Sequence, residues 1–332
     1  MTAAAPASAA SLRARAIRNL LFATVFWGLS FPVMRALSFT QQGLLPEASS
    51  WFFTALGVTY RFGFAGLLMA LFFFRELKNI SRCEMEQGTV LAFFGVGGIL
   101  LQMDGLAYTD ASISAFLTQG YCVFIPLWVA LVHRLPVTWK KFWCIALVVA
   151  GVAVLAKLNF NSFKLGRGEL ETLLASLLFT GQILSLEHPR YAANRSTNFS
   201  IVMFLLMAVF AAPLVWATAP NVSACMQAYA SWPACGFLAL LVVFCTLISY
   251  TVMNRWQKHV AATEAGLIYC IEPVGASVLA LFLPGIFSVW AGINYPNEEF
   301  TMRLLLGGGL ITAANVLLLS PWLEKRGVTS DE

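Results

Sequence analysis

The residue of this sequence best suited to do chemistry is Glu272, which lies directly before Pro273 inside the apolar stretch 263–287. An apolar stretch of that length is typical of a membrane-spanning helix, and Glu272 would lie ~12 Å inside the bilayer at ~1.5 Å of rise per residue. Proline removes a backbone donor and kinks a helix, so nearby carbonyl groups need other partners. An ionisable side chain beside such a kink predicts a functional site within the membrane.

Arg61 is a second charged residue predicted to lie deep in the membrane, ~15 Å from the start of the apolar stretch 51–74 by helical rise. As a functional residue, it would bind an anionic group of a ligand through two parallel hydrogen bonds. As a structural residue, it would pair with Glu272 or Asp104, or bind carbonyl groups freed at a helix kink. We favour the structural role because an isolated buried charge is so unfavourable.

Uncharged side chains supply the other candidates for a binding site. Trp27 and Phe31 are one helical turn apart and predict an aromatic wall for a ligand, although aromatic residues that only pack have the same spacing. Polar groups at various depths predict hydrogen bonds to a ligand or between helices: Gln119, Tyr121, Gln182, Tyr250, Tyr269 and Asn315. The seven cysteines contain no CxxC pair, and we predict no catalytic residue, no metal site and no cofactor.

The composition excludes an ordinary soluble protein. Of the 332 residues, 59% are hydrophobic and 11% are charged, whereas soluble domains have roughly 45–50% and about 25%. Residues 196–254 contain no Asp, Glu, Lys or Arg, and Pro220 and Pro233 mark a turn region between two predicted helices. The net charge of +5 comes from basic residues at helix ends rather than in one patch, so no nucleic-acid partner is predicted.

The apolar stretches predict an all-α membrane protein with ten transmembrane helices. Their approximate bounds are 19–38, 51–74, 88–108, 111–133, 141–157, 168–188, 197–218, 232–254, 264–284 and 302–322. Residues 1–17, rich in Ala and Ser, are predicted to be a disordered cytoplasmic tail, and residues 324–332 a second cytoplasmic tail.

The basic residues orient the predicted helices. The termini and the loops on their side carry fifteen Lys and Arg, the loops on the other side carry five, and Arg61 completes the total of 21. The positive-inside rule therefore predicts a multi-pass protein of the cytoplasmic (inner) membrane with both termini in the cytoplasm.

The second half of the chain resembles the first half at an offset of about 150 residues. The matching segments keep their order: 21–31 with 173–183, 115–123 with 265–273, and 147–154 with 310–317 after an extra loop near 285–300. Two five-helix repeats are predicted, at 18–160 and 161–323. Because five is an odd number, the second repeat would be inverted, which is an architecture of alternating-access transporters.

Four groups of residues together resemble the EamA-type members of the drug/metabolite transporter superfamily. They are Phe26-Trp27-Gly28 with Phe31, Arg61-Phe62, Ala265 through Glu272-Pro273-Val274, and Asn297-Glu298 followed by Leu306-Gly307-Gly308-Gly309-Leu310-Ile311 with Ala314-Asn315. The resemblance covers residues 19–323. The sequence departs from the family pattern in the first half, where Cys122-Val123 stands in place of Glu-Pro.

The resemblance implies a ten-helix carrier of small metabolites, often amino acids or related compounds, and frequently an exporter. Its partners would be a small-molecule substrate, membrane lipid and protons, and it would be a monomer or a homodimer. A lipid flippase on the same scaffold stays an alternative. An intramembrane enzyme is disfavoured because the sequence has no HExxH, no GxSxG and no intramembrane aspartate pair.

Two roles for Glu272 follow from this prediction. Burial disfavours the charged form of a carboxyl group, so Glu272 could bind and release a proton as access alternates, which would couple transport to a proton gradient. Alternatively, Glu272 stays ionised and closes the cytoplasmic ends of the two halves by pairing with a basic residue.

Overall fold

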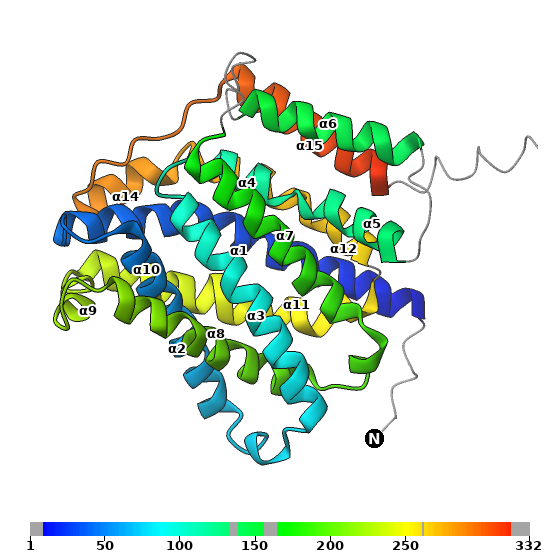
Figure 1. Cartoon of the computed structure of the whole chain (residues 1–332), viewed down its shortest axis with the longest axis horizontal. Helices are drawn as coiled ribbons and strands as arrows, with labels where there is room; N and C mark the ends of the chain where they lie inside the picture. Colours follow the sequence, from blue (N-terminus) through cyan, green and yellow to red (C-terminus); the bar gives the residue numbers. More distant parts are fainter. Residues whose placement is uncertain (1–8, 133–138, 156–164, 261, 320–332) are drawn as a thin grey trace, which may run out of the picture.

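The computed structural model describes residues 9–132, 139–155, 165–260 and 262–319, and every regular element in these residues is a helix (Figure 1). The first half contains α1 (Ala9–Leu44), α2 (Ser50–Phe72), α3 (Arg82–Gly105), α4 (Ala111–Thr118), α5 (Tyr121–Val132) and α6 (Trp139–Leu155). The second half contains α7 (Arg167–Glu187), α8 (Ser196–Thr218), α9 (Ala224–Gln227), α10 (Trp232–Val242), α11 (Ser249–Trp256), α12 (Ala262–Tyr269), α13 (Ile271–Ala280), α14 (Leu283–Ala291) and α15 (Met302–Leu319). Short 3₁₀ turns are η1 (Leu77–Asn79), η2 (Pro189–Tyr191) and η4 (Gln257–His259), and the π-helical segment η3 (Val243–Ile248) joins α10 to α11.

Seven helices of the described residues are long and apolar enough to cross a membrane. They are α1, α2, α3, α4 continued by α5, α7, α8, and α10 continued through η3 and α11. The bent pair of α13 and α14, at 51°, would make an eighth span, whereas α6 and α15 contain only shorter apolar segments in the described part. The multi-pass all-α class is therefore confirmed, and the count of ten stays a prediction.

The first helix begins earlier in the chain than the predicted start at residue 19. Helix α1 begins at Ala9, so residues 9–17, predicted to be disordered, are helical, and Ala16 is fully buried. The physical reason is that alanine, leucine and arginine are strong helix formers, and an apolar stretch directly follows them. Residues 1–8 and the predicted tail 324–332 lie outside the described residues.

The predicted span 264–284 is not one straight helix. It is divided at Cys270 into α12 and α13, and α14 occupies part of the region 285–300 that was predicted to be a loop. Gly292 ends α14 with a φ of +65°, a left-handed conformation that glycine adopts without strain. The chain from Ile293 to Thr301 then returns in an extended form to α15.

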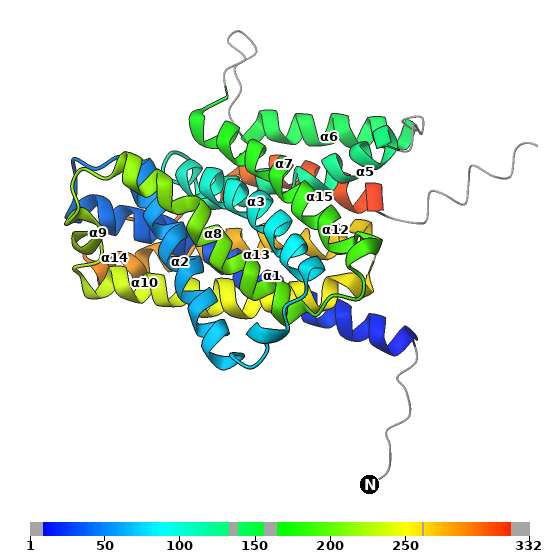
Figure 2. The same ribbon diagram turned by 60° about the horizontal axis from the view of Figure 1, so that its bottom comes forward.

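Four helices, α2 and α3 from the first half and α7 and α8 from the second, pack closely on one another. Glycines allow this approach: a Cβ atom at Gly88 would lie 2.6 Å from the Val202 side chain, and one at Gly98 would lie 2.5 Å from the ring of Phe179. Helices α6 and α15 run side by side along one edge of the bundle, and the long α1 passes through its middle (Figures 1 and 2).

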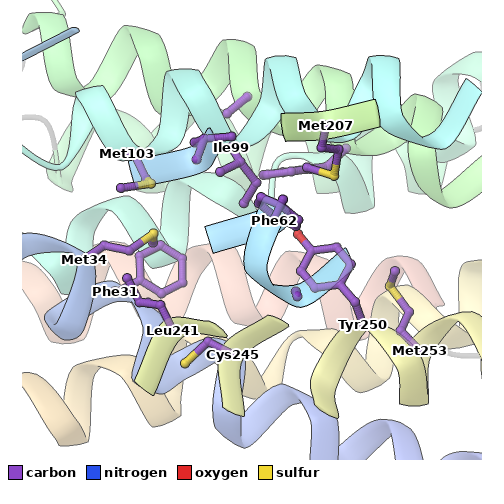
Figure 3. Packing of buried hydrophobic residues seen from close by; sticks show 14 of the residues in the cluster. Phe31, Met34, Phe62, Ile99, Met103, Met207, Leu241, Cys245, Tyr250 and Met253 are labelled. Atoms are coloured by element: carbon purple, nitrogen blue, oxygen red, sulfur yellow. The ribbon is translucent and has the colours of Figure 1, made fainter. Parts of the chain in front are cut away.

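The core of the bundle is formed by aromatic and sulfur-containing side chains from several helices (Figure 3). Phe31 and Met34 of α1 lie close to Leu241 and Cys245, which belong to the π-distorted helix of the second half (Figure 3). Flexible methionine side chains fill irregular gaps where helices with breaks cannot interlock regularly.

The same four helices are joined at one end of the bundle by a polar network around Glu84. Ser81 and Glu84 form a capping box at the start of α3. The Glu84 carboxylate also accepts hydrogen bonds from the Arg195 backbone N–H at 3.1 Å, from Arg195 Nε at 3.0 Å and from Asn198 Nδ2 at 2.9 Å. We call this end the Arg195 end; it connects the α2–α3 turn of the first half with the α7–α8 turn of the second.

A substitution at Gly88 tests the close packing of α3 on α8. Gly88→Ala should lower the free energy of unfolding by about 1–3 kcal/mol, because the new methyl group meets Val202 and the Phe199 carbonyl, 2.9 Å from the Cβ position. Gly309→Ala is the matched control, since nothing lies within 4 Å of its Cβ position. Thermal denaturation in detergent would measure both, and equal melting of the two variants would contradict this packing.

Candidate functional site

A cavity of about 60 Å³ lies inside the bundle, and both halves of the chain line it. That volume has room for a few water molecules. The lining residues come from α1, α2, α3, α4, α5, α7, α11, α12 and α13: Trp27, Ser30, Arg61, Ile99, Gln102, Thr118, Tyr121, Phe179, Gln182, Ile183, Tyr250, Met253, Tyr269 and Glu272.

Two broken helices meet beside this cavity. The first half breaks at Gln119 and Gly120, between α4 and α5, and the second half breaks at Cys270, between α12 and α13. Helix α4 packs on α13, and α5 packs on α12. Broken helices within a membrane expose backbone groups, and such groups are tolerated where protein buries them or where they line a cavity.

Pro273 explains one of these exposed groups. Proline has no N–H, so the carbonyl of Tyr269, four residues earlier, loses its regular helical donor. The side chain of Gln119 replaces that donor, with its Nε2 atom 3.1 Å from the Tyr269 oxygen. Gln119 is 1% exposed and does not line the cavity, so its place is at the joint between the halves.

Glu272 lies in the first turn of α13, with its side chain lining the cavity and 7% of the residue exposed. Within the described residues it forms no ion pair. The N-terminal turn of a helix favours a nearby negative charge, so the break that creates this helix start also helps to place a carboxylate there. Gly28 lets α1 approach α13 closely, since its Cβ position is 3.1 Å from the Glu272 carbonyl oxygen.

Arg61 is 1% exposed, and neither of the predicted carboxylates is its partner. Its Nε donates to the Thr246 hydroxyl at 2.5 Å and its Nη2 donates to the Cys245 carbonyl at 2.9 Å. Both acceptors belong to the π-helical segment η3, where the regular helical bonding is shifted. Three kinds of partner were predicted for Arg61 from the sequence: a ligand anion, a carboxylate of the chain, or carbonyl groups freed at a distorted helix. The structure shows the third kind, the Cys245 carbonyl of η3.

Aromatic rings enclose one side of the cavity. The Trp27 ring meets the Tyr269 ring edge-on at 5.2 Å and the Tyr250 ring at 5.7 Å, and Tyr121 lies 6.5 Å from Tyr269. The indole N–H of Trp27 is buried and has no hydrogen-bond partner among the described residues. A ligand with an acceptor group would satisfy it.

The Tyr269 hydroxyl is held in place from the Arg195 end of the bundle. It donates to Gln257 Oε1 at 2.8 Å, and Gln257 Nε2 donates to the Ile183 carbonyl at 3.2 Å. Gln257 is fully buried in η4. No sequence pattern pointed to Gln257, because its bond depends on a turn that returns to α12.

Other predicted residues have mixed outcomes. Gln182 lines the cavity, whereas Phe31 is fully buried in the core and does not line it, so Phe31 has the packing role that its spacing also allowed. The reason is that residues one turn apart still differ in direction, and α1 turns Phe31 toward Met34 and Leu241 (Figure 3). Asn315 lies on α15, and its side chain is outside the described part.

Several lining residues were missed by the sequence analysis. Thr118 ends α4 and accepts a hydrogen bond from Gln102 Nε2 at 3.0 Å, and Ser30 lies one turn after Trp27. The polar run Thr118–Gln119–Gly120 inside an apolar stretch was the available signal for the first break. Asp104, which was considered as a partner of Arg61, is fully buried and pairs with Arg167 instead.

Arg61→Lys tests the bonding of the π-helical segment. Lysine keeps the charge but lacks the fork that reaches Thr246 and Cys245 together, so the free energy of unfolding should fall by about 1–3 kcal/mol. Arg18→Lys, at an exposed site of α1, is the control and should change it by less than about 0.5 kcal/mol. Thermal denaturation of both purified variants gives the comparison, and an unchanged Arg61→Lys protein would contradict this bonding.

Comparison with known proteins shows a family similarity for the first half and a likeness of fold for most of the chain. Residues 15–157 match the model of the EamA-like transporter family. One solved crystal structure of a protein covers 92% of this chain and 99% of its own chain with a TM-score of 0.54, and its 15% sequence identity makes this a likeness of fold alone. No curated protein matches the sequence. The first half of the chain is therefore similar to the EamA-like transporter family, and the match ends at residue 157.

Proposed function

We propose that this chain is a secondary transporter that exports small metabolites, such as amino acids or related compounds, across the cytoplasmic membrane by alternating access. The observation that carries the proposal is the cavity at the meeting of two broken helices, with the Glu272 carboxylate in its wall. Discontinuous helices at the interface of two halves are typical of binding sites in secondary transporters. The similarity of residues 15–157 to the EamA-like transporter family supports the same class of activity.

The proposed architecture is ten spans in two inverted five-helix repeats. Each half has one helix broken near its centre, α4–α5 in the first and α12–α13 in the second, and the α6–α15 pair would be the last span of each half.

In this proposal Glu272 binds and releases the driving proton. No basic residue of the described chain pairs with it, which favours the proton role over an ionic closure of the cytoplasmic ends. Trp27, Tyr121 and Tyr269 would contact the apolar body of the substrate, and Gln182 would bond its polar groups. Arg61, held by η3, would position the wall rather than bind the substrate directly.

The lining also bears on the lipid flippase alternative. Amide, hydroxyl and carboxylate groups line the cavity beside the aromatic rings. Hydrogen-bonding groups of this kind suit a polar metabolite better than an acyl chain, since unpaired buried polar groups are costly against hydrocarbon. A soluble substrate is therefore preferred.

The orientation gives one test. Both termini are proposed to be cytoplasmic, with the Arg195 end of the bundle on the same side. An alkaline phosphatase fusion after Glu332 should be inactive and a green fluorescent protein fusion should fluoresce. Active phosphatase at that position would overturn the orientation.

The function itself is tested by an export screen. Cells that overproduce the native protein would be challenged with amino acids, analogues, nucleosides and lipophilic cations, and one class should become less toxic and fall in cell content. Glu272→Gln should remove the dependence of this export on an imposed pH gradient, because glutamine cannot exchange a proton. Glu47→Gln, at an exposed loop position, should leave it intact.

If the well-expressed native protein protects against no compound in the panel, the exporter proposal fails. If Glu272→Gln exports with the full native response to pH, the proton role of Glu272 fails while the exporter role stands.

A further inference from the structure

Glu298 of the second half bonds to the first half at the end of the bundle opposite to the Arg195 end, and we call this end the Glu298 end. Arg167 of the second half also pairs with Asp104 of the first half there. Glu298 lies in the extended segment between α14 and α15. Its backbone N–H donates to the carbonyl of Ala280, the last residue of α13, at 3.0 Å. Glu298 is thereby fixed to the end of the half-helix that begins at Glu272.

The carboxylate of Glu298 binds the start of α4, which belongs to the first half. One oxygen accepts hydrogen bonds from the backbone N–H groups of Ala111 at 2.8 Å and Ser112 at 3.4 Å, and the other accepts one from the Ser112 hydroxyl. The first N–H groups of a helix have no partner within the helix, and a negative charge is favourable beside them. Asp110, the residue that precedes α4, makes no such capping bond with its own side chain.

Arg35 of α1 adds a third element to this cluster. Its Nη1 lies 2.8 Å from Asp110 Oδ1 and 3.7 Å from Glu298 Oε1, and its guanidinium faces the rings of Phe39 and Tyr295 at 5.5 Å each. Arg35 and Asp110 belong to the first half, whereas Tyr295 and Glu298 belong to the second. The cluster therefore joins the two halves at the Glu298 end.

Two of the charged side chains in the cluster have little access to water, whereas the Asp110 side chain is 52% exposed. The Glu298 side chain is 10% exposed and that of Arg35 is 16% exposed. Burial raises the pKa of the Glu298 carboxyl, and Asp110 acts in the same direction, while the Ser112 hydroxyl, Arg35 and the Ala111 N–H oppose the rise. Charge-assisted hydrogen bonds of low exposure are stronger than exposed pairs, so parting Glu298 from the start of α4 would cost more than breaking a surface ion pair.

The helices that Glu298 joins, α4 and α13, extend from the Glu298 end to the cavity. These two half-helices pack on each other, and their other ends carry Thr118 and Glu272, which line the cavity. A path from the cavity to the Glu298 end that runs between the two half-helices opens only if they separate. Glu298 is bonded to both, by its N–H and by its carboxylate.

We propose that Glu298 is a latch: it holds the ends of α4 and α13 together and so closes the cavity toward the Glu298 end. The proposal rests on alternating access at this same cavity. It assigns a role to the Asn297-Glu298 pair, in which Asn297 fixes the segment by accepting the Gly285 N–H at 2.7 Å.

The test measures access to the cavity rather than transport. Ser30→Cys places a reporter thiol in the cavity wall, in a background in which the cysteines that are not buried, Cys83, Cys225 and Cys235, are changed to serine. A membrane-impermeant methanethiosulfonate is applied to vesicles of either orientation, and the same background without Ser30→Cys gives the rate to subtract. Glu299→Cys, made separately at an exposed position, shows which membrane face carries the Glu298 end.

Glu298→Ala should raise the labelling rate of the reporter from the face that labels Glu299→Cys by at least about tenfold, because one lost charge-assisted hydrogen bond already outweighs that factor. Ser112→Ala removes only the hydroxyl donor and should give a smaller increase. Glu299→Ala, an exposed neighbour, should give none. Thermal denaturation would establish that each variant is folded.

A folded Glu298→Ala protein that labels at the parent rate from both faces would overturn the latch. A reporter that responds as expected, in a protein that protects against no compound in the export screen, would keep the latch and remove the proposed transport. Equal increases for Glu298→Ala and Glu299→Ala would also overturn it, since the effect would then come from loss of charge on the segment.

Discussion

The structure depends on one missing hydrogen bond donor. Pro273 cannot donate to the carbonyl of Tyr269, and Gln119 from the other half of the chain donates instead, at 3.1 Å. This single bond joins two breaks that would each be costly alone in a membrane. The break also creates the helix start at which Glu272 lies, so the same proline that weakens the helix positions the carboxylate.

Two other backbone groups without a regular helical partner are also bonded by side chains of distant elements. Arg61 donates to the Cys245 carbonyl in the π-helical segment, and Glu298 accepts from the first N–H groups of α4. In the described part of the chain, these bonds run between the two halves. A movement that separates the halves must exchange such bonds for others, which limits the molecule to a few discrete arrangements rather than a continuous range.

Local composition was enough to predict much of the fold. The long apolar stretches became helices, the Pro220–Pro233 region separates α8 from α10, and Glu272 and Trp27 do line a cavity. Residues that act across the molecule were not predictable in this way. The carbonyl partner of Arg61, the joint at Gln119 and the capping by Glu298 each depend on a residue more than 140 positions away. The choice between a wall and a packing role for Phe31 was open for a related reason, since spacing along one helix does not show which neighbouring helix a side chain contacts.

The central claim is that the cavity between the broken helices is the path of the transported molecule. The most direct measurement is export of the identified substrate before and after alkylation of Thr118→Cys, which places a thiol in the cavity wall. In a background without the cysteines that are not buried, alkylation should abolish export by this variant and leave its parent unaffected. Full export by a quantitatively alkylated Thr118→Cys protein would show that the substrate passes elsewhere, and would contradict the account.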